Sequence, residues 1–206
     1  MSEASILPPA RKVARPGASP NARGHIAREL VETIVLTAVI FFVVHISVQP
    51  FEVKGPSMEP GLFTGEYVMV NTLAYLFGGP QRGDVIVFHP PTNPSVTYVK
   101  RVIGIPGDRI DISLNAVFVD GIRLNEPYIY PLPSGVNENN SVFTDIRLGP
   151  GQYFVLGDHR QDSDDSRDFG YVPRANIVGK AEMVFWPLGD VHIISTYSQV
   201  FAHVSP

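Results

Sequence analysis

The chain has 206 residues, a formal net charge of −4 at pH 7 and 44% hydrophobic residues, and it contains no cysteine. The missing cysteines exclude disulfides, cysteine nucleophiles and thiolate metal sites. The acidic balance gives no electrostatic reason to expect nucleic acid as a partner.

The N-terminal residues 1–28 form a segment of their own. They show no apolar periodicity and are rich in proline and glycine, which predicts a disordered arm. Their basic side chains outnumber the acidic ones and comprise Arg11, Lys12, Arg15, Arg23 and Arg28.

An apolar run follows, and we interpret residues 29–49 as a membrane anchor. Leu30–Val48 reads LVETIVLTAVIFFVVHISV, close to the roughly 20 residues that a helix needs to cross a bilayer. Pro50 then ends the helix. A buried core helix is one alternative, but the run has no polar stripe. A cleavable signal peptide is the other, but no small-x-small site follows the run. The basic arm predicts a single-pass membrane protein with a cytoplasmic N-terminus and residues 50–206 on the other side of the membrane.

Residues 50–206 are rich in short β patterns and long enough for one compact domain. Asp120-Gly121 is a two-residue hairpin signal. We expect a helical turn at Thr72–Phe77 and a polar loop at Pro131–Ser141. The pattern predicts a mainly β fold, an antiparallel sheet that is closed or barrel-like. The expected strands are Glu66–Asn71, Asp84–His89, Val96–Ile105, Arg109–Ile112, Ala116–Val119, Tyr153–Leu156, Ile177–Phe185 and Val191–Ser195.

Ser57 is a candidate nucleophile in a stiff turn, Gly55–Pro60, shortly after the apolar run. A serine hydroxyl needs an adjacent base. Two side chains compete for that role, His159 in a dense polar loop and Lys100 in an apolar strand. Strand alternation points Lys100 and Arg101 to opposite faces, so that one of them faces inward. A buried lysine has a lowered pKa and can accept a proton, whereas two solvated residues on an edge strand are the alternative.

The polar loop Gly157–Gly170 alternates Asp, Ser and Arg after a strand. This composition favours a platform of ion pairs, with Arg167 bidentate to a carboxylate. A calcium loop is the rival interpretation, but the spacing differs from an EF-hand and the arginines disfavour a cation. The sequence therefore indicates no metal and no cofactor.

Four segments in this order resemble the boxes of the bacterial type I signal peptidases. They are Gly55–Pro60, Arg82–Phe88, Tyr98–Asp108 and Gly157–Pro173, followed by Ile177–Ala181. The resemblance implies a membrane-bound serine endopeptidase that removes signal peptides from exported preproteins, with a mostly antiparallel β catalytic domain. A self-cleaving regulator of the LexA-like kind and a catalytically silent scaffold are the competing functions. The apolar run argues against the regulator, and the joint presence of Ser57, Lys100 and Ser163 argues against the scaffold.

The resemblance also assigns roles to individual residues. It implies that Ser57 is the nucleophile and an oxyanion donor through its backbone N–H, and that Lys100 is the general base. Ser163 is expected to orient the lysine amine, and Asp165 and Arg167 to form a supporting ion pair. Some family members have a serine where this chain has Gly55, so a second oxyanion donor is not assigned.

The partners implied by the resemblance are preproteins and the lipid bilayer, without nucleic acid. Signal peptides end in small-x-small sites, which imply two shallow apolar pockets. The residues expected to line them are Phe51, Val53, Leu62 and Val99.

Overall fold

The computed structural model describes residues 22–113, 116–131 and 143–204. The chain divides into two compact units, Met1–Val43 and Val44–Pro206. Residues 1–21 of the expected basic arm lie outside the described part. The same is true of the polar loop expected at Pro131–Ser141, apart from its first residue.

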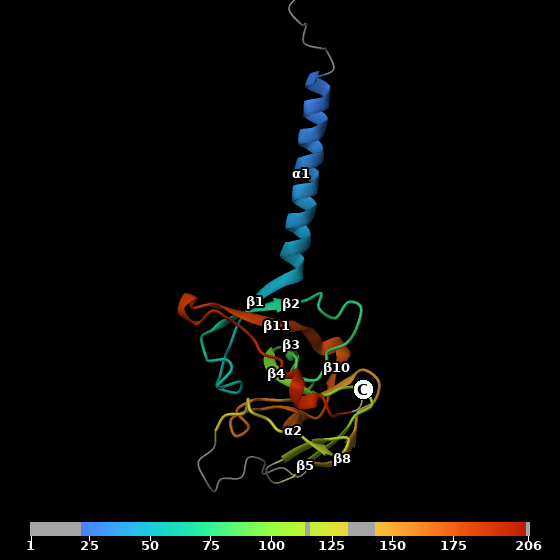
Figure 1. Ribbon diagram of the computed structural model, residues 1–206, viewed down its shortest axis with the longest axis vertical. Coiled ribbons are helices and arrows are strands. Elements are labelled where there is room, and N and C mark those ends of the chain that lie inside the picture. The colour runs from blue at the N-terminus through green and yellow to red at the C-terminus, as the bar shows by residue number, and fades with distance from the viewer. Residues whose placement is uncertain (1–21, 114–115, 132–142, 205–206) are drawn as a thin grey trace, which may run out of the picture. The chain divides into compact units, whose positions relative to one another are not determined.

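A single helix, α1, runs from Ala22 to Ser47 (Figure 1). It therefore begins before the expected start at residue 29 and ends three residues before Pro50, as expected of a helix breaker. Near its start, Arg28 Nε donates to Glu32 Oε1 at 2.7 Å, one turn further along. Over the described residues, no helix combines the length and the apolarity needed to cross a membrane.

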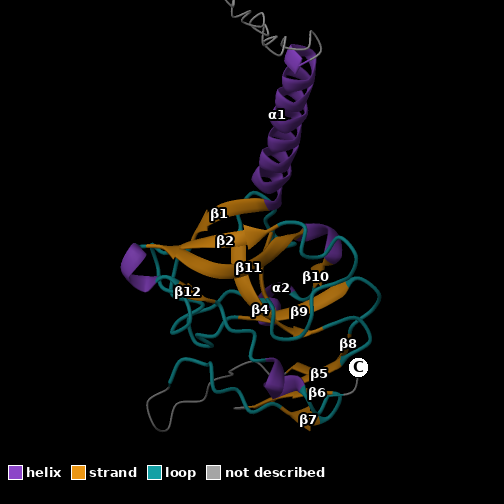
Figure 2. Cartoon of the chain, turned by 45° about the horizontal axis from the view of Figure 1, so that its top comes forward, coloured by secondary structure: helices purple, strands orange, loops and turns teal. Residues whose placement is uncertain are grey.

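The main sheet of the second unit is antiparallel and has the strand order β1-β2-β11-β3-β4-β9-β10, with β12 paired to β11 (Figures 1 and 2). Its edge strand β1 was not expected, because its residues adjoin and overlap the apolar run. Pro50 is tolerated there because an edge strand pairs on one side only. The strands are β1 Val48–Glu52, β2 Tyr67–Asn71, β3 Val85–Phe88, β4 Tyr98–Gly104, β9 Gln152–Leu156, β10 Val172–Pro173, β11 Ile177–Trp186 and β12 His192–Ile193.

A second antiparallel sheet has the order β7-β6-β5-β8, and none of its described strands is hydrogen-bonded to the main sheet (Figure 2). The hairpin predicted at Asp120-Gly121 is confirmed, because both residues have positive φ (52° and 79°) and join β6 to β7. The strands are β5 Arg109–Ser113, β6 Ala116–Val119, β7 Ile122–Arg123 and β8 Phe143–Arg147.

Buried apolar side chains of the described residues form layers against the main sheet. One layer joins the two sheets through Ile103, Phe154 and Ile110, each fully buried. Another layer includes Met58 and Leu62, both 1% exposed, from the segment that carries Ser57. Burying one such side chain stabilises the fold by about 1.5–3 kcal/mol, so this packing fixes the segment onto the sheet.

The remaining helical segments are short: α2 Ser166–Phe169, η1 Arg174–Asn176, η2 Leu188–Asp190 and η3 Ser198–Phe201. The helical turn expected at Thr72–Phe77 is a series of turns instead, with one hydrogen bond from Leu76 N to Leu73 O at 3.0 Å. The prediction of a mainly β, antiparallel fold is confirmed.

Candidate active site

Ser57 lies in the connection between β1 and β2, on a turn closed by a hydrogen bond from Glu59 N to Pro56 O at 2.9 Å. Gly55 precedes it with φ +86°, a conformation that favours glycine. Met58, the next residue, is buried in the core and holds the turn in place. The turn thus presents a half-buried hydroxyl on a fixed backbone.

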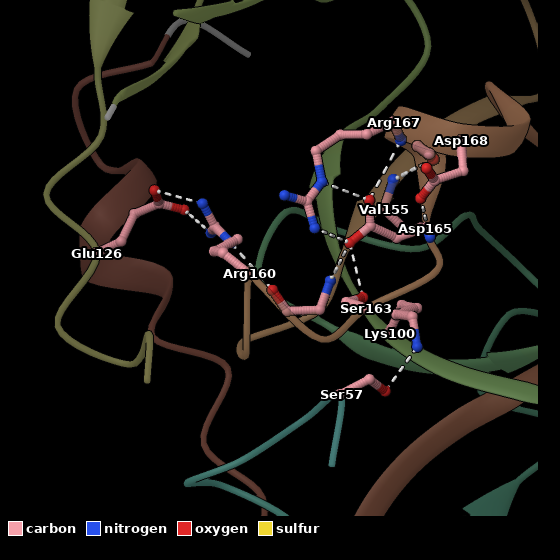
Figure 3. A network of polar contacts seen from close by, with 11 residues as sticks. Ser57, Lys100, Glu126, Val155, Arg160, Ser163, Asp165, Arg167 and Asp168 are labelled. Carbon is pink, nitrogen blue, oxygen red and sulfur yellow. Dashed lines mark hydrogen bonds and ion pairs between the residues drawn. The ribbon is translucent and has the colours of Figure 1, made fainter. Parts of the chain in front are cut away.

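Lys100 extends from β4 to this hydroxyl, and its Nζ lies 2.7 Å from Ser57 Oγ (Figure 3). The lysine is only 4% exposed. Burial lowers its pKa to about 8, although the charges of Asp165 and Asp164 oppose the shift. The amine is therefore in hydrogen-bond contact with the serine and loses its proton far more easily than an exposed lysine.

Arg101 follows Lys100 on β4 and contacts an entirely different set of groups. Its guanidinium donates two hydrogen bonds to Asp158, at 2.8 and 2.7 Å, and others to the carbonyl oxygens of Gly83 and Ser195. Burial opposes its charge, but Asp158 outweighs burial and raises the pKa of Arg101. The expected alternation is therefore present. The alternative of two solvated residues is wrong, because Arg101 is 2% exposed and Lys100 is buried too.

Asp165 is the centre of the polar loop (Figure 3). Arg167 donates to both of its carboxylate oxygens at 2.8 Å, and Gly157 N donates at 2.9 Å. Although burial favours the neutral acid, these donors hold the pKa of Asp165 below its ordinary value. The ion pair expected between Asp165 and Arg167 is thus present. Asp165 also caps α2, since its side chain accepts from Arg167 N.

The position of Ser163 differs from the expectation. Its hydroxyl donates to Asp165 Oδ2 at 2.7 Å, and within the described part of the chain no hydrogen bond joins it to the Lys100 amine. The physical reason is that an ionised carboxylate is a stronger acceptor than an amine. The donated proton leaves the lone pairs of the Ser163 oxygen free to accept.

Gly157 was not recognised from the sequence as a functional position. A Cβ built on it would lie 2.5 Å from Ser57 O and would also collide with the Ser163 side chain. Two residues further on, His159 N donates to the same Ser57 oxygen at 3.0 Å. The end of β9 therefore holds the peptide of the nucleophile directly. A glycine immediately before Asp158 was the available signal, but only the fold shows what approaches it.

His159 contributes its backbone to the site, whereas its ring is engaged elsewhere. The ring stacks on Tyr130, with 4.2 Å between the centroids, and its Nδ1 is buried without a hydrogen-bond partner. Among the described residues, Lys100 is the side chain that contacts the Ser57 hydroxyl. The geometry therefore favours lysine over histidine as the base.

A cleft of about 200 Å³ surrounds the Ser57 hydroxyl, and Val53 and Val99 are among its lining residues. Two other residues expected at substrate pockets lie elsewhere. Leu62 is 1% exposed in the core, and Phe51 packs against the same apolar cluster. Both are bulky and apolar, and such side chains gain more from filling the core than from lining a shallow groove.

The backbone N–H of Ser57 has no acceptor within the described part of the chain. A donor in this position is available to a developing oxyanion. Gly55 lies beside open space, because an ideal Cβ at this residue would have nothing within 4 Å. The fold and the site together define a class, an antiparallel β hydrolase with a serine and a lysine in hydrogen-bond contact.

The chain is similar to known proteins of one family of hydrolases. The family described as "Signal peptidase, peptidase S26" matches residues 27–186. Signal peptidase IB of Staphylococcus aureus is 38% identical over 179 residues, which cover 79% of this chain and 93% of that protein. Signal peptidase I of Bacillus caldolyticus is 41% identical over 145 residues, covering 66% and 79%. A crystal structure of a signal peptidase I from Enterococcus faecalis aligns with a TM-score of 0.45 and 34% identity, over 49% of this chain and 95% of that one.

The chain belongs to the signal peptidase family, and it is a peptide hydrolase that removes signal peptides. The family predicted from the sequence is thereby confirmed.

Proposed function

We propose that the chain cleaves preproteins through an acyl-enzyme in which Ser57 is the nucleophile and Lys100 the general base. The observation that carries this proposal is the 2.7 Å contact between Ser57 Oγ and a buried Lys100 Nζ. A lysine whose pKa is about 8 is partly neutral near pH 7 and can accept the serine proton. Its burial supplies the physical cause of that property.

The proposed reaction has two stages. Ser57 Oγ attacks the scissile carbonyl carbon while its proton moves to Lys100 Nζ, and the N–H of Ser57 donates to the oxyanion. The C–N bond then breaks, and the Lys100 ammonium gives its proton to the leaving amine. In the second stage Lys100 takes a proton from water, the hydroxide attacks the ester, and Ser57 leaves with that proton.

Ser163, Asp165 and Arg167 are proposed to support these stages without reacting. The Ser163 hydroxyl proton is committed to Asp165, so its oxygen can accept from Lys100 when the amine becomes an ammonium. The Asp165–Arg167 pair keeps the loop that carries Ser163 in one conformation. These three are positioning residues rather than catalytic ones.

The substrates are proposed to be preproteins with small side chains at the cleavage site. Val53 and Val99 line the cleft beside the Ser57 hydroxyl and give it apolar walls that suit small apolar side chains. Phe51 and Leu62 are proposed to support these walls indirectly. Leu62 belongs to the core cluster that contains Val53, and Phe51 and Val99 pack against that cluster. An extended peptide would pair with exposed strand backbone and so bind without a fixed sequence.

Residues 29–49 are proposed to attach the enzyme to the plasma membrane. The support is the apolar run of the sequence together with the basic residues that precede it, which favour a cytoplasmic N-terminus and an extracytoplasmic domain 50–206. Protease added to intact spheroplasts should digest the domain while sparing residues 1–28. Release of the full chain from membranes by alkaline carbonate would contradict the attachment.

The dyad is tested with the full chain in detergent and a preprotein substrate. Ser57→Ala and Lys100→Met should each lower cleavage by at least about a thousandfold with an unchanged melting temperature. Ser95→Ala, an exposed serine outside the cleft, should retain full activity. Full activity of either dyad variant would overturn the mechanism.

A further inference from the structure

The mouth of the cleft around Ser57 carries more negative than positive charge. Three exposed carboxylates line the cleft together with the apolar walls, and we call them the acidic rim: Glu52, Asp162 and Asp164. They come from two segments, since Glu52 ends β1 and the two aspartates belong to the loop before α2. Two distant parts of the chain therefore bring carboxylates to one opening.

The charge of the acidic rim is only weakly compensated. Lys54 Nζ lies 3.7 Å from Glu52 Oε2, but both side chains are exposed, at 80% and 43%, and such pairs are weak. Asp164 accepts a hydrogen bond from Tyr98 OH at 2.7 Å, which fixes its carboxylate without neutralising it. Over residues 22–113, 116–131 and 143–204, no hydrogen bond or ion pair engages the Asp162 carboxylate.

One member of the acidic rim, Asp164, also acts on the proposed base. Asp164 is one of the charges that raise the pKa of Lys100 against the effect of burial. A charge whose electrostatic field acts on the Lys100 amine also acts on a substrate bound beside that amine. The charge of Asp164 therefore acts where the peptide would lie, and Glu52 and Asp162 line the same cleft.

An extended peptide points successive side chains to opposite sides. In a small-x-small site, the two small residues face the valine walls and the middle residue faces the mouth. Resting on the function proposed above, we propose that the acidic rim selects preproteins with lysine or arginine at this middle position and disfavours glutamate or aspartate there. Asp162, whose carboxylate no described residue engages, is the main determinant.

The test uses three peptides that differ only at the middle residue, which is lysine, glutamine or glutamate. The wild-type enzyme should cleave the lysine peptide with a kcat/KM at least about fivefold above that of the glutamate peptide, and the glutamine peptide should be intermediate. Raising the NaCl concentration from about 0.05 M to about 0.5 M should bring the ratio toward one, because salt screens exposed charges.

Variants identify the source of the preference. Asp162→Asn should reduce the lysine-to-glutamate ratio, and Asp162→Lys should invert it. Asp145→Asn is the matched control: it removes one exposed carboxylate on β8, outside the residues that line the cleft, and should leave the ratio unchanged. Using a ratio cancels any general change in activity or folding.

The outcomes separate the two proposals. Equal cleavage of all three peptides by the wild type would leave the proposed function intact and overturn the selection. A ratio that survives Asp162→Lys and high salt would also overturn it. If the enzyme cleaves none of the peptides and no preprotein, the proposed function fails and the selection fails with it.

Discussion

Lys100 and Arg101 are consecutive residues of β4, both nearly inaccessible to solvent, and their cationic groups have opposite kinds of partner. Arg101 has a bidentate carboxylate, which keeps it charged, whereas the Lys100 amine contacts a neutral serine hydroxyl. Strand alternation separates the two groups onto different faces of the sheet. One face thereby gains a fixed charge that orders the structure, and the other gains a base.

The first prediction concerns pH. Because Lys100 must be neutral to accept a proton and its pKa is about 8, kcat/KM should fall about tenfold per pH unit below pH 8 and level off above it. Asp164→Asn should move this limb to lower pH, because the Asp164 charge raises the pKa of the lysine. A pH series with one peptide substrate measures both. A limb with a midpoint near 6.5 that Asp164→Asn leaves in place would instead implicate a histidine.

The second prediction concerns Gly157. A methyl group there would approach Ser57 O within 2.5 Å, so the Gly157→Ala variant must displace the nucleophile or the end of β9. We expect kcat to fall by about a hundredfold, since small misplacements are costly in catalysis. Gly189→Ala is the control, because nothing lies within 4 Å of its added Cβ. Equal kcat values for the two variants would show that the close approach has no catalytic importance.

The third prediction concerns the buried ion pair between Arg101 and Asp158, whose side chains are 3% and 1% exposed. Asp158→Asn should lower the free energy of unfolding by about 3–5 kcal/mol, because it leaves a buried charge uncompensated. The matched comparison is Asp145→Asn, which breaks an exposed pair with Arg109 and should cost less than about 1 kcal/mol. Urea unfolding followed by fluorescence gives both values. A similar loss in the two variants would contradict the role of burial.

The fourth prediction concerns Ser163, which bonds to Asp165 rather than to Lys100. Ser163→Ala should reduce kcat with little change in KM, because the ammonium loses an acceptor that the free enzyme does not use. Ser163→Thr keeps the hydroxyl and should restore most of the activity. If Ser163→Ala instead changed only the melting temperature, the residue would have a purely structural role.

The local elements were predictable where the sequence signal is itself local. The Asp120-Gly121 hairpin and the end of α1 before Pro50 depend on a few neighbouring residues, and both agree with the structure. Strands β1, β8 and β10 escaped prediction. β1 adjoins the apolar run, β8 follows directly on a polar segment, and β10 has only two residues. β1 pairs with β2 and β8 pairs with β5, and in each pair a long connecting segment separates the two strands in the chain.

For the site as well, the sequence predicted the residues, whereas their contacts depend on the fold. Motif order singled out Ser57, Lys100, Asp165 and Arg167 as candidates, and the structure brings Ser57 together with Lys100 and Asp165 together with Arg167. Motifs do not state which atoms meet. The hydroxyl of Ser163 donates to Asp165, and Leu62 is buried in the core rather than lining the cleft. Which acceptor a hydroxyl bonds, and whether an apolar side chain packs in the core or lines a cleft, depend on neighbours that the residue has only in the folded chain.

Residue types and their order were sufficient to predict the family, the two candidate reacting side chains and an antiparallel β architecture, since the sequence encodes these directly. The burial of Lys100 against Ser57 and the close approach of Gly157 to the nucleophile's peptide became apparent only in the folded chain. The same holds for the carboxylates from two segments that surround one cleft. The pKa of a lysine and the field at a cleft depend on what surrounds them in space, and strands far apart in the chain supply those surroundings.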